Sequence, residues 1–330
     1  MRFSCLLFIV ATCSVAGFAG DDSASAGLTG DAQIIPRLRP VAVDADLLPK
    51  ADIRADTDIV LVPVTVTDRH NRFVKGLNQE SFEVYEDKIR QRIVSFGCDD
   101  APISLGIVFD TSGSMGPKLQ RSRLAVAEFL KTANAEDEAF LVEFSDKPRL
   151  TVPLTHYLSE IQNRLLSTRP KGKTALLDSV RLALNTLKTA HNARKALLLI
   201  TDGGDNRSRY TKAEVRGALE ESDVQLYAIG IYESGRARNR TPEESTGPKL
   251  LTELSEPTGG RHFIVENLTD LPDVAAKIGV ELHNQYVIGY TPANAERDGK
   301  FRRIAVQVVQ PSGFPMFSAH WRSGYIAPTQ

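Results

Sequence analysis

The chain has 330 residues, of which 42% are hydrophobic and 25% are charged, and its formal net charge at pH 7 is −1. Acidic and basic residues are interspersed, so no basic patch indicates nucleic acid or an anionic lipid surface as a partner. The length is sufficient for one large domain together with a smaller one.

The first 19 residues have the pattern of a signal peptide. Arg2 precedes an apolar run, and the small residue Ala19 stands at the expected cleavage position. The run is too short for a membrane span, and no other segment of the sequence approaches the length of a transmembrane helix. The sequence therefore predicts an exported protein of the periplasm, the cell envelope or the extracellular space. Lipidation at Cys13 is left open, and so is the oligomeric state.

Cysteine usage excludes an internal disulfide in the exported form. Two of the three cysteines lie within residues 1–19, which leaves Cys98 alone. We expect Cys98 to serve as a small buried hydrophobic residue.

Residues 20–55 are rich in polar and small residues, and their prolines follow no period, which predicts a flexible linker. Strand patterns begin in the segment 56–100. Residues 60–66 alternate, and Pro63 restricts that strand to an edge or to a position without a ladder hydrogen bond. Residues 82–85 and 93–96 are predicted to pair as a hairpin that is joined through residues 86–88.

The segment 101–283 alternates between strand and helix patterns. The predicted strands are 103–109, 139–144, 196–201, 224–230 and 261–265, and the predicted helices are about 118–132, 175–189, 212–222 and 270–282. This order predicts an α/β fold with a doubly wound, mostly parallel sheet and helices on both faces.

Three local features complete this segment. Thr211 and Glu214 form a capping box for the third predicted helix. Arg121 and Arg123, which lie near Lys118 in the sequence, are expected on a solvated helix face. Residues 232–248 are expected to form a long polar loop.

Strand patterns return in the segment 284–330. Neither this segment nor residues 56–100 has enough strands to close a core alone. We therefore predict one small β-domain that is built from both segments, with the α/β domain inserted between them.

Polar side chains gather where two of the predicted parallel strands end. The apolar run 103–109 ends at Asp110, which is followed by the hydroxyls of Ser112 and Ser114. Asp202 ends a second strand, and Thr174 stands at a helix start. Side chains at the carboxyl ends of parallel strands face one crevice, and oxygen ligands with few carboxylates suit Mg²⁺ or Mn²⁺. Each residue taken singly also fits a helix cap or a turn. Together they favour a metal site.

This set resembles the metal-ion-dependent adhesion site (MIDAS) of the von Willebrand factor A (VWA) family, in which Asp-x-Ser-x-Ser is followed by a Thr and an Asp. The motif is matched by Asp110, Ser112, Ser114, Thr174 and Asp202. Flanking motifs resemble a group of exported bacterial VWA proteins that is well represented in acidobacteria. They include Val64–Asp68, Phe82–Asp87 and Tyr286–Tyr290.

The resemblance implies a binding module for cell adhesion or assembly and not an enzyme. Asp110, Ser112 and Ser114 would hold Mg²⁺, and Thr174 and Asp202 would assist directly or through water. A Glu or Asp of a protein partner would supply the last ligand. A site with only two carboxylates leaves the ion electrophilic, which favours an incoming carboxylate.

Two alternatives stay open. A Mg²⁺-dependent phosphoester hydrolase with Asp110 as nucleophile would need a general acid or base beside the metal. The six histidines show no ligand spacing, and Asp205, the one further acid nearby, also fits a turn. The second alternative is a structural scaffold with no metal-dependent role.

Overall fold

The computed structural model describes residues 59–98, 100–232, 242–309 and 317–329. All of them belong to the second of two units, Met1–Ala55 and Asp56–Gln330, into which the chain divides. The predicted signal peptide and linker lie outside the described residues, as do residues 233–241 of the predicted polar loop.

The core of the fold is a six-stranded sheet with the order β10-β9-β8-β5-β6-β7. Its first five strands in this order run parallel, and β7 is an antiparallel edge strand. The bounds are Ile103–Asp110 (β5), Glu138–Phe144 (β6), Pro148–Thr155 (β7), Arg194–Thr201 (β8), Val224–Ile231 (β9) and His262–Val265 (β10). β5, β6 and β9 are buried along their whole length, as parallel strands covered on both faces are.

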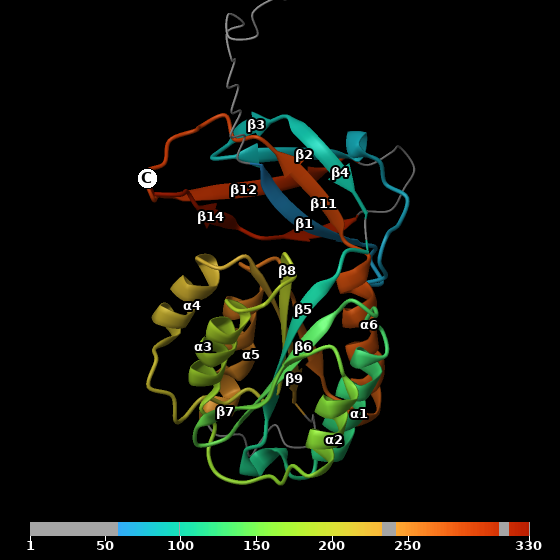
Figure 1. Cartoon of the computed structure of the whole chain (residues 1–330), viewed down its shortest axis with the longest axis vertical. Helices are drawn as coiled ribbons and strands as arrows, with labels where there is room; N and C mark the ends of the chain where they lie inside the picture. Colours follow the sequence, from blue (N-terminus) through green and yellow to red (C-terminus); the bar gives the residue numbers. More distant parts are fainter. Residues whose placement is uncertain (1–58, 99, 233–241, 310–316, 330) are drawn as a thin grey trace, which may run out of the picture. The chain divides into compact units, whose positions relative to one another are not determined.

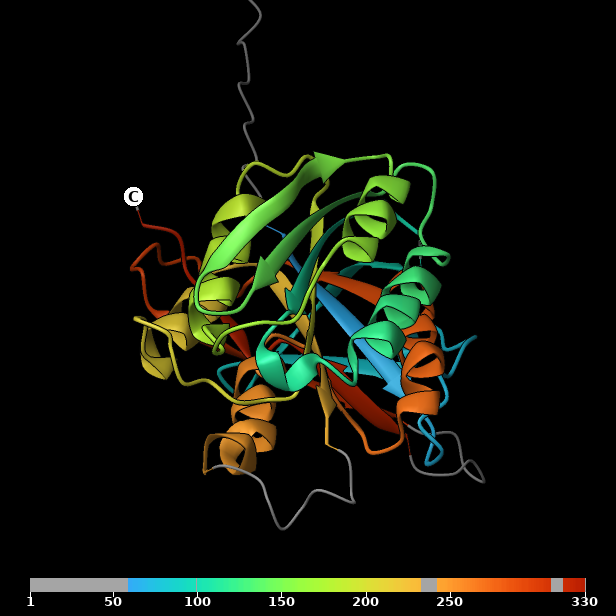
Figure 2. The same cartoon turned by 90° about the horizontal axis from the view of Figure 1, so that it is seen from below.

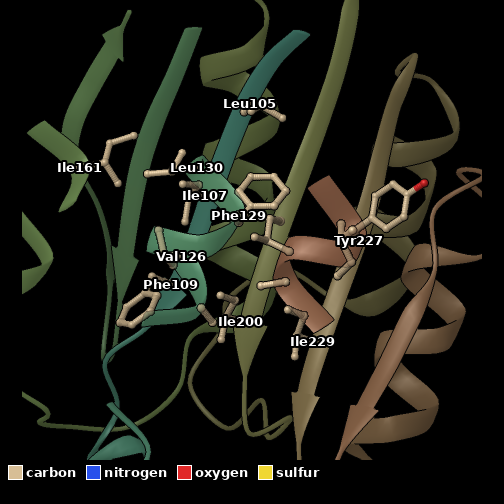
Figure 3. Packing of buried hydrophobic residues seen from close by; sticks show 14 of the residues in the cluster. Leu105, Ile107, Phe109, Val126, Phe129, Leu130, Ile161, Ile200, Tyr227 and Ile229 are labelled. Carbon is tan, nitrogen blue, oxygen red and sulfur yellow. The ribbon is translucent and has the colours of Figure 1, made fainter. Parts of the chain in front are cut away.

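Helices cover both faces of this sheet (Figure 1). They are Leu119–Leu130 (α1), Ser159–Leu166 (α2), Leu176–Leu187 (α3), Lys212–Glu220 (α4), Pro242–Ser255 (α5) and Leu271–His283 (α6). α1, α2 and α6 contribute to one hydrophobic core, and α3, α4 and α5 contribute to the other. Figure 3 shows the first core, in which Ile107 and Phe109 of β5 belong to one cluster with Val126 and Phe129 of α1. The predicted doubly wound α/β fold is confirmed.

Within the segment 101–283 the structure adds β7, α2 and α5 to the predicted strands and α-helices. β7 contains two prolines, and Val152 is its one buried residue, so it lacks the continuous apolar run by which the buried strands were predicted. α2 is eight residues long and buries only Ile161 and Leu165. α5 contains Pro248 and covers 242–248, so the prediction of a loop was wrong for those residues. The capping box of α4 at Thr211 is present as predicted.

The remaining strands form two four-stranded antiparallel sheets, β13-β1-β11-β4 and β14-β12-β2-β3. Their bounds are Val60–Thr67 (β1), Phe82–Glu86 (β2), Ile89–Gln91 (β3), Ile93–Gly97 (β4), Tyr286–Tyr290 (β11), Phe301–Val308 (β12), Ser318–Trp321 (β13) and Gly324–Ile326 (β14). Val62 and Ile288 of the first sheet share one core with Val84 and Val306 of the second. Each sheet combines strands from both ends of the described chain, which is the predicted small β-domain.

Details of this β-domain correct the sequence analysis. β2 pairs with β3 and not with β4. Asp87 and Lys88, with φ values of 47° and 72°, form a tight turn directly after β2, so the next residues of the chain pair with it. β4 instead joins β11 of the other sheet.

Two single-residue predictions have different outcomes. Cys98 is exposed, so the prediction of a buried residue was wrong. Pro63 pairs with β11, and β1 begins to pair with β13 one residue later, at Val64. This position agrees with the prediction, because proline has no backbone N–H to donate to a second neighbouring strand.

Buried polar contacts link α6 to the strands around it. Gln285, between α6 and β11, is fully buried, and its amide donates to Thr65 Oγ1 at 3.0 Å and to Tyr227 Oη at 3.1 Å. Arg261 forms a buried ion pair with Glu281 of α6 at 2.9 Å. These bonds satisfy polar groups that would be costly to bury alone.

His283, the last residue of α6, lies between two carboxylates. Its Nδ1 is 2.8 Å from Asp100 Oδ1, and its Nε2 is 3.2 Å from Asp137 Oδ2. Burial opposes the charged imidazolium, but the hydrogen bonds and charges of Asp137 and Asp100 outweigh it and raise the pKa of His283 above 6.5. The charged form therefore stabilises the fold.

This raised pKa predicts a pH-dependent stability difference. The contribution of His283 is complete below the unfolded-state pKa and is lost as the pH rises through the higher folded-state pKa. We expect His283→Gln to lower the free energy of unfolding by about 1–3 kcal/mol at pH 6, and by less at pH 9. Denaturant unfolding at both pH values measures this. The exposed His70→Gln is the matched control, and a difference that stays constant or grows with pH would contradict the assignment.

Candidate functional site

Asp110 ends β5 and is fully buried. Its Oδ1 accepts a hydrogen bond from the backbone N–H of Ser112 at 2.8 Å, and its Oδ2 accepts one from Thr201 Oγ1 at 2.6 Å. The Oγ atoms of Ser112 and Ser114 are 3.1 Å apart, within the loop and short helical turn that precede α1. The structure therefore brings the three predicted residues of the first loop together.

The register of the sheet brings Asp202 to the same place. β5 and β8 are parallel neighbours with Phe109 opposite Ile200, so Asp110 lies beside Thr201, and Asp202 follows directly. Asp202 is 3% exposed. Figure 2 views the molecule from the side on which these loops lie. Two carboxylates thus occupy one buried region at the carboxyl ends of adjacent strands.

Thr174 joins this region through its backbone. Its N–H donates to Asn206 Oδ1 at 3.0 Å, and its carbonyl accepts from the N–H groups of Asn206 and Arg207. Nearby, Gly113 N–H donates to the carbonyl of Gly172 at 3.0 Å. The loop before α3 is therefore hydrogen-bonded to the loops that carry both carboxylates, and Thr174 itself is buried.

Two nearby polar residues have roles that the structure defines. Asp205 Oδ1 accepts hydrogen bonds from the N–H of Leu176, in the first turn of α3, and from Ser208 Oγ. Asp205 therefore holds a helix start, which agrees with the interpretation of this residue as part of a turn. Thr201, which the sequence analysis did not single out, holds Asp110 and accepts a hydrogen bond from the N–H of Gly203 at 3.1 Å.

Lys118 is a further polar residue of this region, and the sequence analysis did not assign it to the site. This residue lies at the start of α1 and is buried, and its Nζ is 2.8 Å from Asp202 Oδ2. The prediction of a solvated position was wrong for Arg123, which is half-buried and whose guanidinium donates to the carbonyl of Thr168. The sequence shows that basic residues lie near the start of α1, but it does not show which side of this helix faces the ends of the strands.

Burial and neighbouring charge act strongly on Asp110. Burial raises the pKa of Asp110, and the charge of Asp202 raises it further, while the hydrogen bonds from Thr201 and Ser112 lower it. The net effect is a rise from 3.8 to about 7. A positive charge placed between these carboxylates would be strongly favoured.

The donor set fits a hard divalent cation. The site offers two carboxylates and hydroxyl oxygens, which are ligands that Mg²⁺ and Mn²⁺ accept. Within the described part of the chain, no three His, Cys, Asp or Glu side chains gather into a group that could hold a metal ion. Binding at this site would therefore depend on hydroxyl ligands as well as carboxylates.

A separate cavity of about 800 Å³ lies away from these residues. It is lined by the first residues of β8 and β9, Arg194 and Val224, and by Leu61 and Ile326 of the β-domain. The first and last residues of a parallel strand lie at opposite edges of the sheet. This cavity is therefore not part of the region around Asp110 and Asp202.

Comparison with known proteins finds similarity to the von Willebrand factor type A domain. Residues 105–204 match the sequence model of the von Willebrand factor type A domain. An uncharacterized protein of Borreliella burgdorferi is 25% identical over 183 residues, which are 49% of this chain and 53% of that protein. The collagen alpha-5(VI) chain of Mus musculus is 25% identical over 228 residues, 64% of this chain and 8% of its own length. The chain thus spans about half of the first relative and a small part of the second.

A solved structure supports the same fold. The structure described as von Willebrand factor type A from Catenulispora acidiphila aligns with a TM-score of 0.50 and 15% identity. The alignment covers 83% of this chain and 64% of that one. At this identity the likeness concerns the fold alone.

The loop of Asp202 depends on a glycine. Gly203 has a φ of +94°, and a Cβ there would lie 2.3 Å from the hydroxyl oxygen of Tyr232. We expect Gly203→Ala to lower the free energy of unfolding by about 1–3 kcal/mol, because the backbone would be strained and Tyr232 displaced. Denaturant unfolding measures the change. Gly217→Ala in α4, where a Cβ meets nothing within 4 Å, is the control and should be neutral or stabilising. Equal effects of the two substitutions would refute this role for Gly203.

Proposed function

We propose that this chain, whose residues 105–204 match the sequence model of the von Willebrand factor type A domain, is a metal-dependent binding module. Domains of this kind generally serve in protein interaction or adhesion. In this proposal a divalent cation, Mg²⁺ or Mn²⁺, binds beside Asp110, and an acidic residue of a protein partner completes its coordination.

One observation carries the proposal. Two buried carboxylates and a pair of hydroxyls 3.1 Å apart meet where adjacent parallel strands end. Ser112 and Ser114 would offer hydroxyl oxygens, and Asp110 and Asp202 would offer negative charge directly or through water. Thr174, in the loop before α3, would assist in binding the ion directly or through water. When bound, the ion would supply a Lewis-acidic position for a carboxylate.

The described contacts favour binding over hydrolysis. Both carboxylate oxygens of Asp110 accept hydrogen bonds, and the residue is fully buried, which disfavours its attack on a phosphoester. Asp205, the further acid considered as a catalytic group, is engaged at the start of α3. VWA domains are generally non-enzymatic, and we propose the same of this protein.

We further propose that the protein is exported, on the basis of the signal-peptide pattern in residues 1–19. In the part of the chain that the structure describes, no helix combines the length and apolar character needed to cross a bilayer. Export would place the site where divalent cations and partner surfaces are both accessible.

Isothermal titration of Mg²⁺ and Mn²⁺ at pH 8 tests the metal site. We expect the unsubstituted protein to bind one ion, and Asp110→Asn to weaken binding at least about tenfold, because one negative charge beside the ion is lost. Glu136→Gln removes an exposed carboxylate just before β6 and should leave binding unchanged. Binding that is equal in all three proteins would place the metal elsewhere and refute the site.

Partner binding should depend on the same ion. Immobilised protein should retain a partner from the envelope or secreted proteins of its source cells in Mg²⁺ and release it in EDTA, because the partner's carboxylate would bind the ion. Asp110→Asn should retain none of it. Replacing the partner's contacting Glu or Asp by its amide should abolish retention, and a partner held equally in EDTA would contradict metal-dependent binding.

A further inference from the structure

Lys118 and Asp202 form an ion pair that is almost completely buried. The distance from Nζ to Oδ2 is 2.8 Å, and the two side chains are 8% and 3% exposed. Lysine is rarely buried to this degree unless it is paired with an acid. The pair therefore has a specific position in the site and is not a surface contact.

The backbone fixes where the ammonium group can reach. Lys118 N–H donates to the carbonyl of Met115 at 2.9 Å, and its own carbonyl accepts hydrogen bonds from the N–H and Oγ of Ser122. Lys118 thus stands between the turn after Ser114 and the first turn of α1. Its side chain extends from the loop that carries Ser112 and Ser114 to the carboxylate of Asp202.

We propose that Lys118 is a built-in counter-cation, which occupies Asp202 while the site holds no metal and must give way when a divalent ion binds. This inference rests on the function proposed above. It makes Lys118 a determinant of metal affinity, because its ammonium and the ion compete for one carboxylate.

Charge balance explains what such a residue would achieve. Without metal, two buried carboxylates side by side repel each other, and the ammonium group offsets part of that cost. With metal, the same ammonium repels the ion at short range. The loaded site then carries a net positive charge, because one ammonium and one divalent ion exceed two carboxylates. A net positive site favours the carboxylate of an acidic partner, so Lys118 would link metal loading to partner binding.

Titration of Mg²⁺ alone at pH 8 into two Lys118 variants tests the inference. Lys118→Met removes the charge and the hydrogen bond, whereas Lys118→Gln removes the charge but can still donate to Asp202. We expect both to bind Mg²⁺ at least about tenfold more tightly than the unsubstituted protein, because the competing cation is gone. Lys131→Met removes an exposed lysine that directly follows α1, and it should bind as the unsubstituted protein does.

Thermal unfolding supplies a second readout that does not depend on a partner. Metal-free Lys118→Met should unfold at a lower temperature than the unsubstituted protein, because Asp202 has lost its counter-charge. Saturating Mg²⁺ should raise the unfolding temperature of this variant more than that of the unsubstituted protein, because tighter binding to the folded state stabilises it more.

The outcomes separate this inference from the proposed function. If Asp110→Asn abolishes binding but the Lys118 variants bind Mg²⁺ no more tightly, the metal site stands and the counter-cation role is refuted. Weaker binding by Lys118→Met with unchanged binding by Lys118→Gln would show that Lys118 only positions Asp202. Binding by the Lys118 variants but not by the unsubstituted protein would support the inference in its strongest form. If no variant binds, the proposed function fails and the inference with it.

Discussion

The repulsion between Asp110 and Asp202 is the constraint on which the site depends. The two carboxylates are buried beside each other because β5 and β8 are parallel neighbours that end at the same level. Burying two acids together is costly unless positive charge or hydrogen-bond donors compensate. The donors that the structure provides, from Thr201, Ser112 and Lys118, are all directed at these carboxylates. These buried charges and donors are the basis of the cation site that we propose.

The rest of the fold keeps these side chains in place. Two hydrophobic cores hold the parallel sheet between helices, which fixes the level at which the strands end. The three loops are then bonded to one another through backbone groups, as at Gly113 and Gly172 and at Thr174 and Asn206. We expect the loops of such a site to keep their positions when an ion binds, so that only the Lys118 side chain moves and little binding energy is spent on ordering loops.

The sequence predicted the elements whose signals are local and strong. Continuous apolar runs identified the buried parallel strands, and alternation of strands with amphipathic helices identified the α/β class. The spacing of Asp110, Ser112 and Ser114 predicted the first loop of the site, because it follows a strand directly. Elements with weak apolar patterns were missed, namely β7, α2 and α5.

Contacts between distant residues were beyond the sequence analysis. The positive charge of Lys118 is plain in the sequence, but its burial against Asp202 depends on how α1 is rotated over the sheet. The pairing of β2 with β3 depends on positive φ angles at Asp87 and Lys88. Neither residue is a glycine, the residue type that usually indicates such angles in a sequence. Such features depend on tertiary packing and on backbone angles, which residue types alone do not specify.

Anomalous diffraction from crystals grown in saturating Mn²⁺ tests the central claim most directly. The account predicts one manganese peak in contact with the hydroxyls of Ser112 and Ser114, close to Asp110, with the Lys118 ammonium moved away from Asp202. A peak bound elsewhere on the molecule, or no peak while Lys118 still pairs with Asp202, would contradict it.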